Sequence, residues 1–223
     1  MPTLRCLLSV SLLLGASLAV ADDHELESVD KAPKGLSPGI AKLLDPAGYQ
    51  ITGDDDPLVE MWLLKSLSVK PKFKPNFTQM YPFTPGQLVG AIRVAEDVEY
   101  ADFRGQAIKA GVYTLRYGLQ PMDGNHVGTS ETYDFLLALP AKFDQKPDTI
   151  EGFEELSEHS AKAAGSTHPA IFSLLDPSEV KKKKLEHDDF TEHWILSVIG
   201  KGKADDKDVD VKVRLVVVGQ SEG

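Results

Sequence analysis

The chain has 223 residues, of which 42% are hydrophobic and 26% are charged. These proportions are typical of a globular protein and exclude a wholly disordered, collagenous or multi-span membrane chain. The formal net charge is −10 at pH 7. Because such a chain repels phosphate backbones, we expect no nucleic-acid partner.

Residues 1–21 have the pattern of a secretory signal peptide. Arg5 is the only charged residue before Asp22, and the small residues of Ala19-Val20-Ala21 match a cleavage site. The apolar stretch at residues 7–20 is shorter than the ~20 residues that span a bilayer. We therefore predict export to the periplasm or the extracellular space, a mature chain that begins near Asp22, and no transmembrane segment after cleavage.

The only cysteine, Cys6, lies before the apolar stretch, so it cannot be the acylated first residue of a mature lipoprotein. The mature chain has no cysteine and therefore forms neither disulfides nor thiolate sites. Its stability must come from a buried core, which ~200 residues can supply.

The first half of the mature chain changes from polar to alternating sequence. Residues 22–35 (DDHELESVDKAPKG) are polar and charged, and we expect a flexible leader there. A helical turn is predicted at residues 38–44. Alternation of apolar and polar residues then predicts strands at 49–52, 58–69 and 88–95, with a proline-containing loop at 70–85.

The second half carries the clearest elements. Residues 112–119 (VYTLRYGL) alternate strictly, with Tyr113, Leu115 and Tyr117 predicted to face the core. Residues 133–139 are almost wholly apolar, as in a strand buried on both faces. A helix is predicted at about 150–164, ended by Gly165, and further strands at 170–174, 193–199 and 209–218.

These elements predict a mainly β fold. The strands are separated by turns rather than by regular helices, which argues against a parallel α/β sheet. We expect an antiparallel two-sheet β-sandwich with one inserted α-helix, formed by a single domain at residues 36–223.

Three segments also carry a resemblance. Residues 103–128 (FRGQAIKAGVYTLRYGLQPMDGNHVG), 133–140 (YDFLLALP) and 166–174 (STHPAIFSL) resemble a family of uncharacterised secreted bacterial proteins with a GxYTLRYG strand and a DGxHxG loop. A similar Gly-x-Tyr-Thr-Leu strand occurs in prealbumin-like and other immunoglobulin-like sandwiches. The resemblance implies a β-sandwich and no particular activity.

The familiar catalytic and phosphate-binding motifs do not occur in the sequence. It has no G-x-S-x-G elbow, no glycine-rich phosphate loop and no H-E-x-x-H. Residues 205–210 (DDKDVD) lack the glycine and the closing glutamate of a calcium loop, so a charged hairpin end is expected there. The lysine run at 181–184 is expected to be an exposed loop.

The histidines are the main candidates for a functional site. His126 lies in a turn-rich loop with Asp123, His168 follows the predicted helix, and His193 opens a strand. Imidazole and carboxylate groups, with the nearby Met122, could hold a copper or zinc ion. The spacing matches no compact metal motif, so the fold would have to bring the loop at 122–128 to the junction at 166–169. Ordinary loop hydrogen bonds are the alternative interpretation.

The aromatic residues leave a second alternative open. Some of them could line a glycan-binding face, although aromatic residues on alternating strands usually belong to the core. The residues considered are Trp62, Tyr81, Phe83, Tyr100, Phe103, Tyr113, Tyr117 and Trp194.

We therefore expect an exported, non-catalytic β-sandwich that binds a ligand or partner or has a structural role. The alternative is a copper- or zinc-binding protein that uses His126, His168, Asp123 and His193. A metal-assisted hydrolase is a third hypothesis, which would need a substrate pocket in addition to the metal site.

Overall fold

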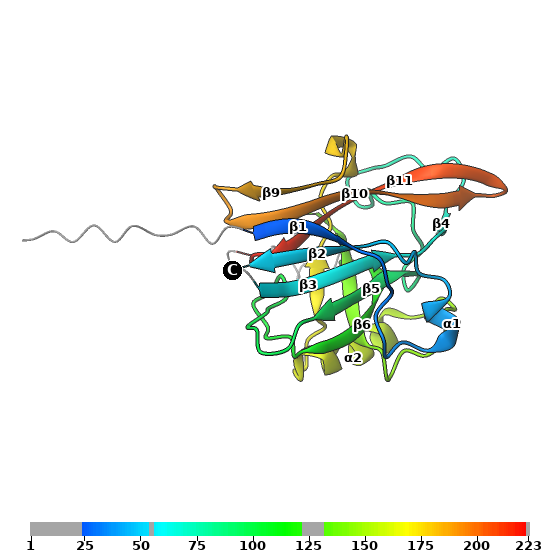
Figure 1. Ribbon diagram of the computed structural model, residues 1–223. Coiled ribbons are helices and arrows are strands. Elements are labelled where there is room, and N and C mark those ends of the chain that lie inside the picture. Colours follow the sequence, from blue (N-terminus) through cyan, green and yellow to red (C-terminus); the bar gives the residue numbers. More distant parts are fainter. Residues whose placement is uncertain (1–23, 54–55, 122–131, 222–223) are drawn as a thin grey trace, which may run out of the picture.

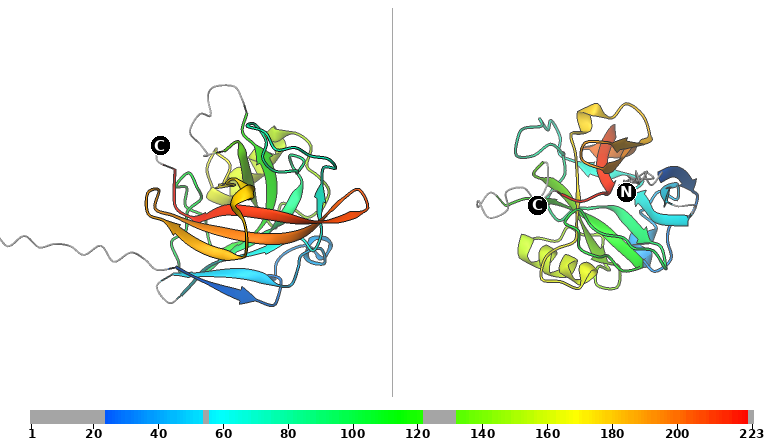
Figure 2. Two further views of the ribbon diagram at one scale, coloured as in Figure 1. Left: turned by 90° about the horizontal axis from the view of Figure 1, so that it is seen from above. Right: turned by 90° about the vertical axis from the view of Figure 1, so that its left-hand side faces the viewer.

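Two β-sheets pack face to face in a computed structural model of the chain, which describes residues 24–53, 56–121 and 132–221 (Figures 1 and 2). The first sheet is antiparallel and has the strand order β1-β2-β3-β5-β6-β7-β8. Its strands are β1 His24–Val29, β2 Gly48–Gly53, β3 Asp56–Leu63, β5 Leu88–Val94, β6 Gly111–Leu119, β7 Asp134–Pro140 and β8 Ile171–Ser173.

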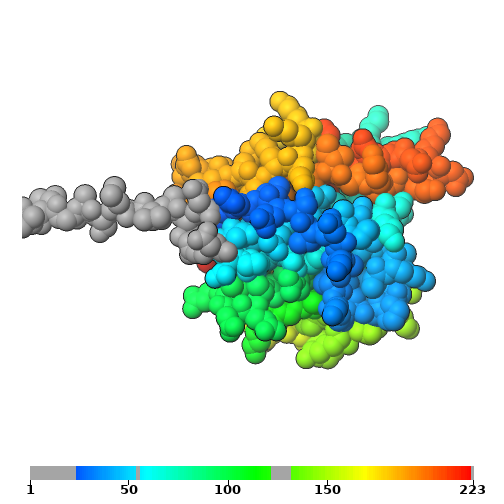
Figure 3. Space-filling view, viewed as in Figure 1, coloured from blue at the N-terminus to red at the C-terminus, as the bar shows by residue number. Residues whose placement is uncertain are grey.

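The second sheet is built around one long hairpin. Strands β10 (His193–Ala204) and β11 (Lys207–Val218) form this hairpin, which extends beyond the edge of the first sheet (Figures 1 and 3). Strand β9 (Lys184–Asp188) pairs antiparallel with the start of β10, and β4 (Leu67–Val69) pairs parallel with its end. A bridge between Leu174 and Leu215 joins the two sheets just after β8.

The main core lies between the two sheets. Leu115 and Leu136 of the first sheet and Leu196, Val213 and Leu215 of the second are fully buried in one apolar cluster. Burial of this apolar area is the dominant force that holds the layers together. The mainly β fold with two sheets and one substantial helix confirms the fold class expected from the sequence.

Helices cover the outer face of the first sheet. The short helix α1 (Pro38–Ala41) is capped by the Ser37 hydroxyl, which accepts a hydrogen bond from the Ile40 amide. Helix α2 (Phe153–Ala164) ends at Gly165 in the left-handed conformation, as its sequence predicts. It lies at the bottom of the view in Figure 1 and packs against β7, where Leu156 joins a second apolar cluster with Leu137 and Leu139. A 3₁₀ turn, η1, occupies Pro177–Glu179.

The alternation at residues 112–119 is confirmed, because Tyr113, Leu115 and Tyr117 of β6 are all buried in the core between the sheets. Every residue of β7 is buried, which confirms a strand covered on both faces. Residues 205–206 form the turn of the β10–β11 hairpin, as expected of the acidic run.

The expectation of a flexible leader is wrong for most of residues 22–35. His24–Val29 form β1, which pairs with β2 through six consecutive residue pairs from His24–Gly53 to Val29–Gly48. Leu26 packs against the main core, and Val29, Ala32 and Leu36 pack beside Trp62. Ordering this polar segment costs conformational entropy. Its few apolar side chains and its hydrogen bonds to β2 offset that cost.

The proposed signal peptide at residues 1–21 lies outside the described residues. In the described part of the chain, no helix has the length and apolar character needed to cross a membrane.

Candidate functional site

Two of the candidate metal ligands lie in the described part of the chain, and each has a structural environment of its own. His168 is exposed at the junction of α2 and β8, where its backbone amide donates to the Ser166 hydroxyl at 3.0 Å. His193 is buried, and its Nε2 lies 3.0 Å from the Gln220 carbonyl oxygen. Since a carbonyl only accepts, Nε2 is the donor, and the contact ties β10 to the segment after β11.

The other two candidate ligands, His126 and Asp123, lie outside the described residues. The convergence of His126 with His168 therefore remains a prediction. Among the residues that the structure does describe, no group of three or more histidine, cysteine or acidic side chains gathers as metal ligands would.

Two buried carboxylates, Asp134 and Asp102, each accept several hydrogen bonds. Asp134 accepts from the Tyr117 hydroxyl at 2.5 Å, the Met80 amide at 2.9 Å and the Tyr81 amide at 3.1 Å. Asp102 accepts from the backbone of its own turn and from the Ile171 amide at 3.0 Å. Burial raises the pKa of both carboxyls, while these hydrogen bonds lower it in part. Both carboxylates hold loops in place rather than face an open cavity.

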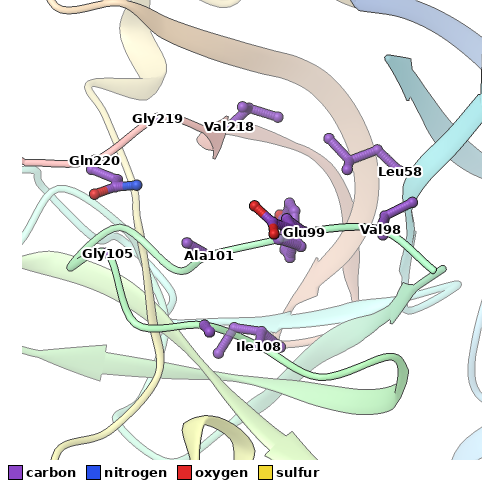
Figure 4. Close-up of a pocket in the computed structure, with 11 residues that line it drawn as sticks. Leu58, Val98, Glu99, Ala101, Gly105, Ile108, Val218, Gly219 and Gln220 are labelled. Carbon is purple, nitrogen blue, oxygen red and sulfur yellow. The ribbon is translucent and has the colours of Figure 1, made fainter. Parts of the chain in front are cut away.

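A hollow lies at the end of the sandwich where β3 begins and β11 ends. This end hollow has a volume of about 620 Å³. Figure 4 shows Glu99 near its middle, with Leu58 and Val218 on one side and Ile108 on the other. The hollow offers an exposed carboxylate but no cation among the described lining residues.

A second cavity has a more apolar floor. It lies between the loop after β4, η1 and the β10–β11 hairpin, and its volume is about 590 Å³. Val69, Phe73, Met80, Val209 and Val211 provide apolar surface along it. The volume falls within the ~300–1,000 Å³ range of small-molecule sites.

Lysines surround that floor. Lys70, Lys72 and Lys212 all line the cavity, which we call the lysine-rimmed groove. Two acidic residues also line it, but each has a structural partner. The Asp176 carboxylate caps the Ser178 amide at 2.8 Å, and Asp210 pairs with Lys201 at 2.7 Å.

The loop at 70–82 forms one wall of the groove because its polar groups fasten it to the sheets. The Lys70 amide donates to the Pro82 carbonyl at 2.9 Å. The Gln79 side-chain amide donates to the carbonyls of Tyr81 and Phe83 at 2.9 and 2.8 Å. The buried Tyr81 hydroxyl donates to the Leu175 carbonyl at 2.8 Å, and Asp134 holds the Met80 and Tyr81 amides. The wall is therefore formed before any ligand arrives.

The groove was missed from the sequence. Residues 70–85 contain four prolines and no apolar period, so they indicate only a loop. Nothing in their spacing shows that Phe73 and Met80 lie opposite Val209 of a strand some 130 residues later. Val209, by contrast, lies in the strand that the sequence predicts at residues 209–218.

A comparison of the chain with protein-family models, with curated proteins and with solved structures finds no match.

Proposed function

We propose that this chain is an exported β-sandwich protein that binds a small amphipathic ligand, with an apolar body and an anionic group, in the lysine-rimmed groove. The observation that carries the proposal is the apolar floor bordered by Lys70, Lys72 and Lys212 on a protein whose net charge is −10. These lysines make the cavity suited to an anionic group, and the Lys70 ammonium also donates to the Gln79 side-chain carbonyl at 3.3 Å.

The charges around the groove favour an anion over a cation. Asp176 and Asp210 are already engaged by a backbone amide and by Lys201. Lys72 and Lys212 are exposed and have no ion-pair partner among the described residues. An ammonium group beside an apolar surface binds a carboxylate, sulfate or phosphate group while the ligand's apolar body covers the floor.

Export is the second part of the proposal. The apolar stretch at residues 7–20, followed by Ala19-Val20-Ala21, supports removal of residues 1–21. A chain without cysteine after that point folds without disulfides in either the periplasm or the extracellular space.

The apolar half of the proposal is tested with two phenylalanines of one loop. Phe73 lines the groove, whereas Phe77 does not line it and is 77% exposed beside Tyr133. Calorimetric titration of the mature protein with dodecanoate should give one site. Phe73→Ala should weaken binding about tenfold, equivalent to ~1.4 kcal/mol, whereas Phe77→Ala should leave it unchanged. Equal affinities for the two variants would show that the groove is not the site.

The anionic half is tested with two lysines of β11. Lys212 lines the groove, and Lys207 lies at the exposed start of the same strand. Lys212→Gln should weaken dodecanoate binding and reduce its salt dependence, whereas Lys207→Gln should do neither. Unchanged dodecanoate binding by Lys212→Gln would remove the charge argument and leave only an apolar site.

A further inference from the structure

The outer edge of β11 has no partner strand beside the lysine-rimmed groove. β11 is the last strand of the second sheet, with β10 on one side. On its other side, Leu215 bridges to Leu174, and the Arg214 carbonyl accepts from the Leu175 amide at 2.9 Å. Before Arg214, no residue that the structure describes forms a backbone pair with this side of β11. Residues 208–212 therefore form a free strand edge.

The backbone groups of this free edge point away from β10. The Arg214 amide donates to the Tyr81 hydroxyl at 3.0 Å and the Arg214 carbonyl accepts from the Leu175 amide, so both groups face the outer side of β11. Successive residues of an antiparallel strand direct their backbone groups to alternate sides, and the β10–β11 pairing has no register shift between residues 208 and 214. The residues that share the direction of Arg214 are therefore Asp208, Asp210 and Lys212.

The free edge borders the groove directly. Val209, Asp210, Val211 and Lys212 all line the groove, although successive side chains of a strand point to opposite faces of its sheet. Since residues of both directions line it, the groove reaches the edge of β11 as well as the inner face. Val209 and Val211 supply apolar surface on that inner face.

We propose that the anionic, amphipathic ligand of the groove is a short extended peptide that pairs with β11 as an additional strand. Its backbone exchanges hydrogen bonds with Asp208, Asp210 and Lys212. Its alternate apolar side chains cover Val209 and Val211, and its terminal carboxylate meets the lysines of the rim. This inference rests on the proposed function and names the chemical class of its ligand.

The charges along the edge favour an anionic peptide. Charged side chains often protect edge strands from pairing, and Asp208 and Asp210 lie on this one. Both are compensated by lysines of β10, since Asp210 Oδ1 lies 2.7 Å from Lys201 Nζ and Asp208 Oδ1 lies 4.0 Å from Lys203 Nζ. Lys212, in contrast, has no ion-pair partner in the described part of the chain. An approaching carboxylate therefore meets a positive charge that is not compensated.

Amide hydrogen exchange, followed residue by residue by NMR, tests the pairing. The probe is the peptide acetyl-Val-Thr-Val-Thr-Val with a free terminal carboxylate. Without ligand, the amides of Asp208, Asp210 and Lys212 should be protected less than those of Val209 and Val211, which donate to β10. Saturating peptide should slow exchange of the three edge amides about tenfold or more, whereas dodecanoate should not protect them.

Two variants of one residue separate the backbone from the side chain. Asp210→Pro removes an N–H of the free edge and no hydrogen bond to β10, and proline is tolerated at such positions of edge strands. Asp210→Ala keeps the N–H, and both variants lose the ion pair with Lys201. Asp210→Pro should bind the peptide about tenfold more weakly than Asp210→Ala does. Equal dodecanoate affinities should show that both variants retain the groove.

The exchange measurement on the unaltered protein decides the question even if Asp210→Pro fails to fold. Edge amides that the peptide leaves unprotected would overturn the inference, as would equal peptide affinities of two folded variants. Protection of the edge amides without peptide, rising with protein concentration, would show that a second copy of the chain occupies the edge and would also overturn it. Dodecanoate binding without peptide binding would overturn the peptide alone, whereas failure of both ligands would overturn the proposed function as well.

Discussion

The guanidinium of Arg116 and the carboxylate of Asp144 form a buried two-pronged ion pair on the outer face of the first sheet. Nε lies 2.6 Å from Oδ2, and Nη2 lies 2.8 Å from Oδ1. Arg116 also donates to the carbonyls of Gly86, Lys146 and Asp148 at 2.6–2.8 Å. One side chain of β6 therefore fastens the whole segment between β7 and α2 to the sheet.

Loss of this pair should be costly. Arg116→Met would leave the Asp144 carboxylate buried with only the Thr114 hydroxyl as a side-chain donor. We expect a loss of ~3–5 kcal/mol in the free energy of unfolding, measured by urea denaturation. Arg93→Met on the neighbouring strand β5 breaks a pair with Glu60 in which the arginine side chain is 44% exposed, and it should cost less than ~1 kcal/mol. Similar costs for the two variants would contradict a structural role for the buried pair.

Leu115 tests the core between the sheets. It lies in β6, between β5 and β7, and is fully buried. Leu115→Ala removes buried methyl groups and leaves a cavity, so it should lower the free energy of unfolding by ~2–5 kcal/mol. A variant that unfolds at the urea midpoint of the unaltered protein would show that β6 is not a core strand.

Two glycines with positive φ distinguish conformational strain from a steric clash. At Gly86 (φ +83°) an added Cβ would lie 1.9 Å from the Ile150 carbonyl oxygen, whereas at Gly152 (φ +94°) nothing lies within 4 Å. Gly152→Ala should cost only the strain of an unfavourable backbone conformation, ~1–3 kcal/mol. Gly86→Ala must also displace the loop that Arg116 holds, so its thermal midpoint should fall much further. Equal melting temperatures would contradict this close approach of the two backbones.

Asp134 gives stability a defined dependence on pH. Burial raises the pKa of its carboxyl above the ordinary 3.8, so the folded protein holds this proton more tightly than the unfolded chain does. The contribution of Asp134 to stability therefore falls as pH rises from about 3.8 through the raised pKa.

The matching variant is Asp134→Asn, which cannot ionise. It should be less stable than the unaltered protein, because its NH₂ group cannot accept from the Met80 or Tyr81 amide or from the Tyr117 hydroxyl, and because no proton uptake stabilises its folded state at acid pH. Its deficit should be largest at low pH and should narrow as pH rises through that window. Urea denaturation across the acid range checks this, with the exposed Asp208→Asn as control. A deficit that widens with pH would mean that the folded-state pKa is lowered instead.

The sequence predicts the sandwich better than it predicts the sites, for a physical reason. The alternation around Leu115 and the apolar run of β7 are local patterns that burial imposes on each strand. Arg116 occupies a position in the alternation that is typical of a solvent-facing residue, yet it is fully buried. Its burial depends on the ion pair with Asp144, which lies 28 residues away in the sequence. No spacing rule connects the two.

Edge strands show the same limit. Residues 24–29 are polar because β1 lies at the edge of its sheet and only Leu26 and Val29 need to pack. Strand β9 was not predicted at all, since the lysine run at 181–184 leads directly into it. Both strands form because a neighbouring strand supplies their hydrogen bonds, and single-sequence alternation does not show such a neighbour.

The most direct test of the proposed function is a methyl NMR titration of the mature protein with dodecanoate. Binding in the lysine-rimmed groove predicts that the largest shifts occur at Val69, Met80 and Val209, while Leu58 and Ile108 in the end hollow stay unchanged. Shifts concentrated at Leu58 and Ile108, or no saturable shift at the groove methyls, would contradict it.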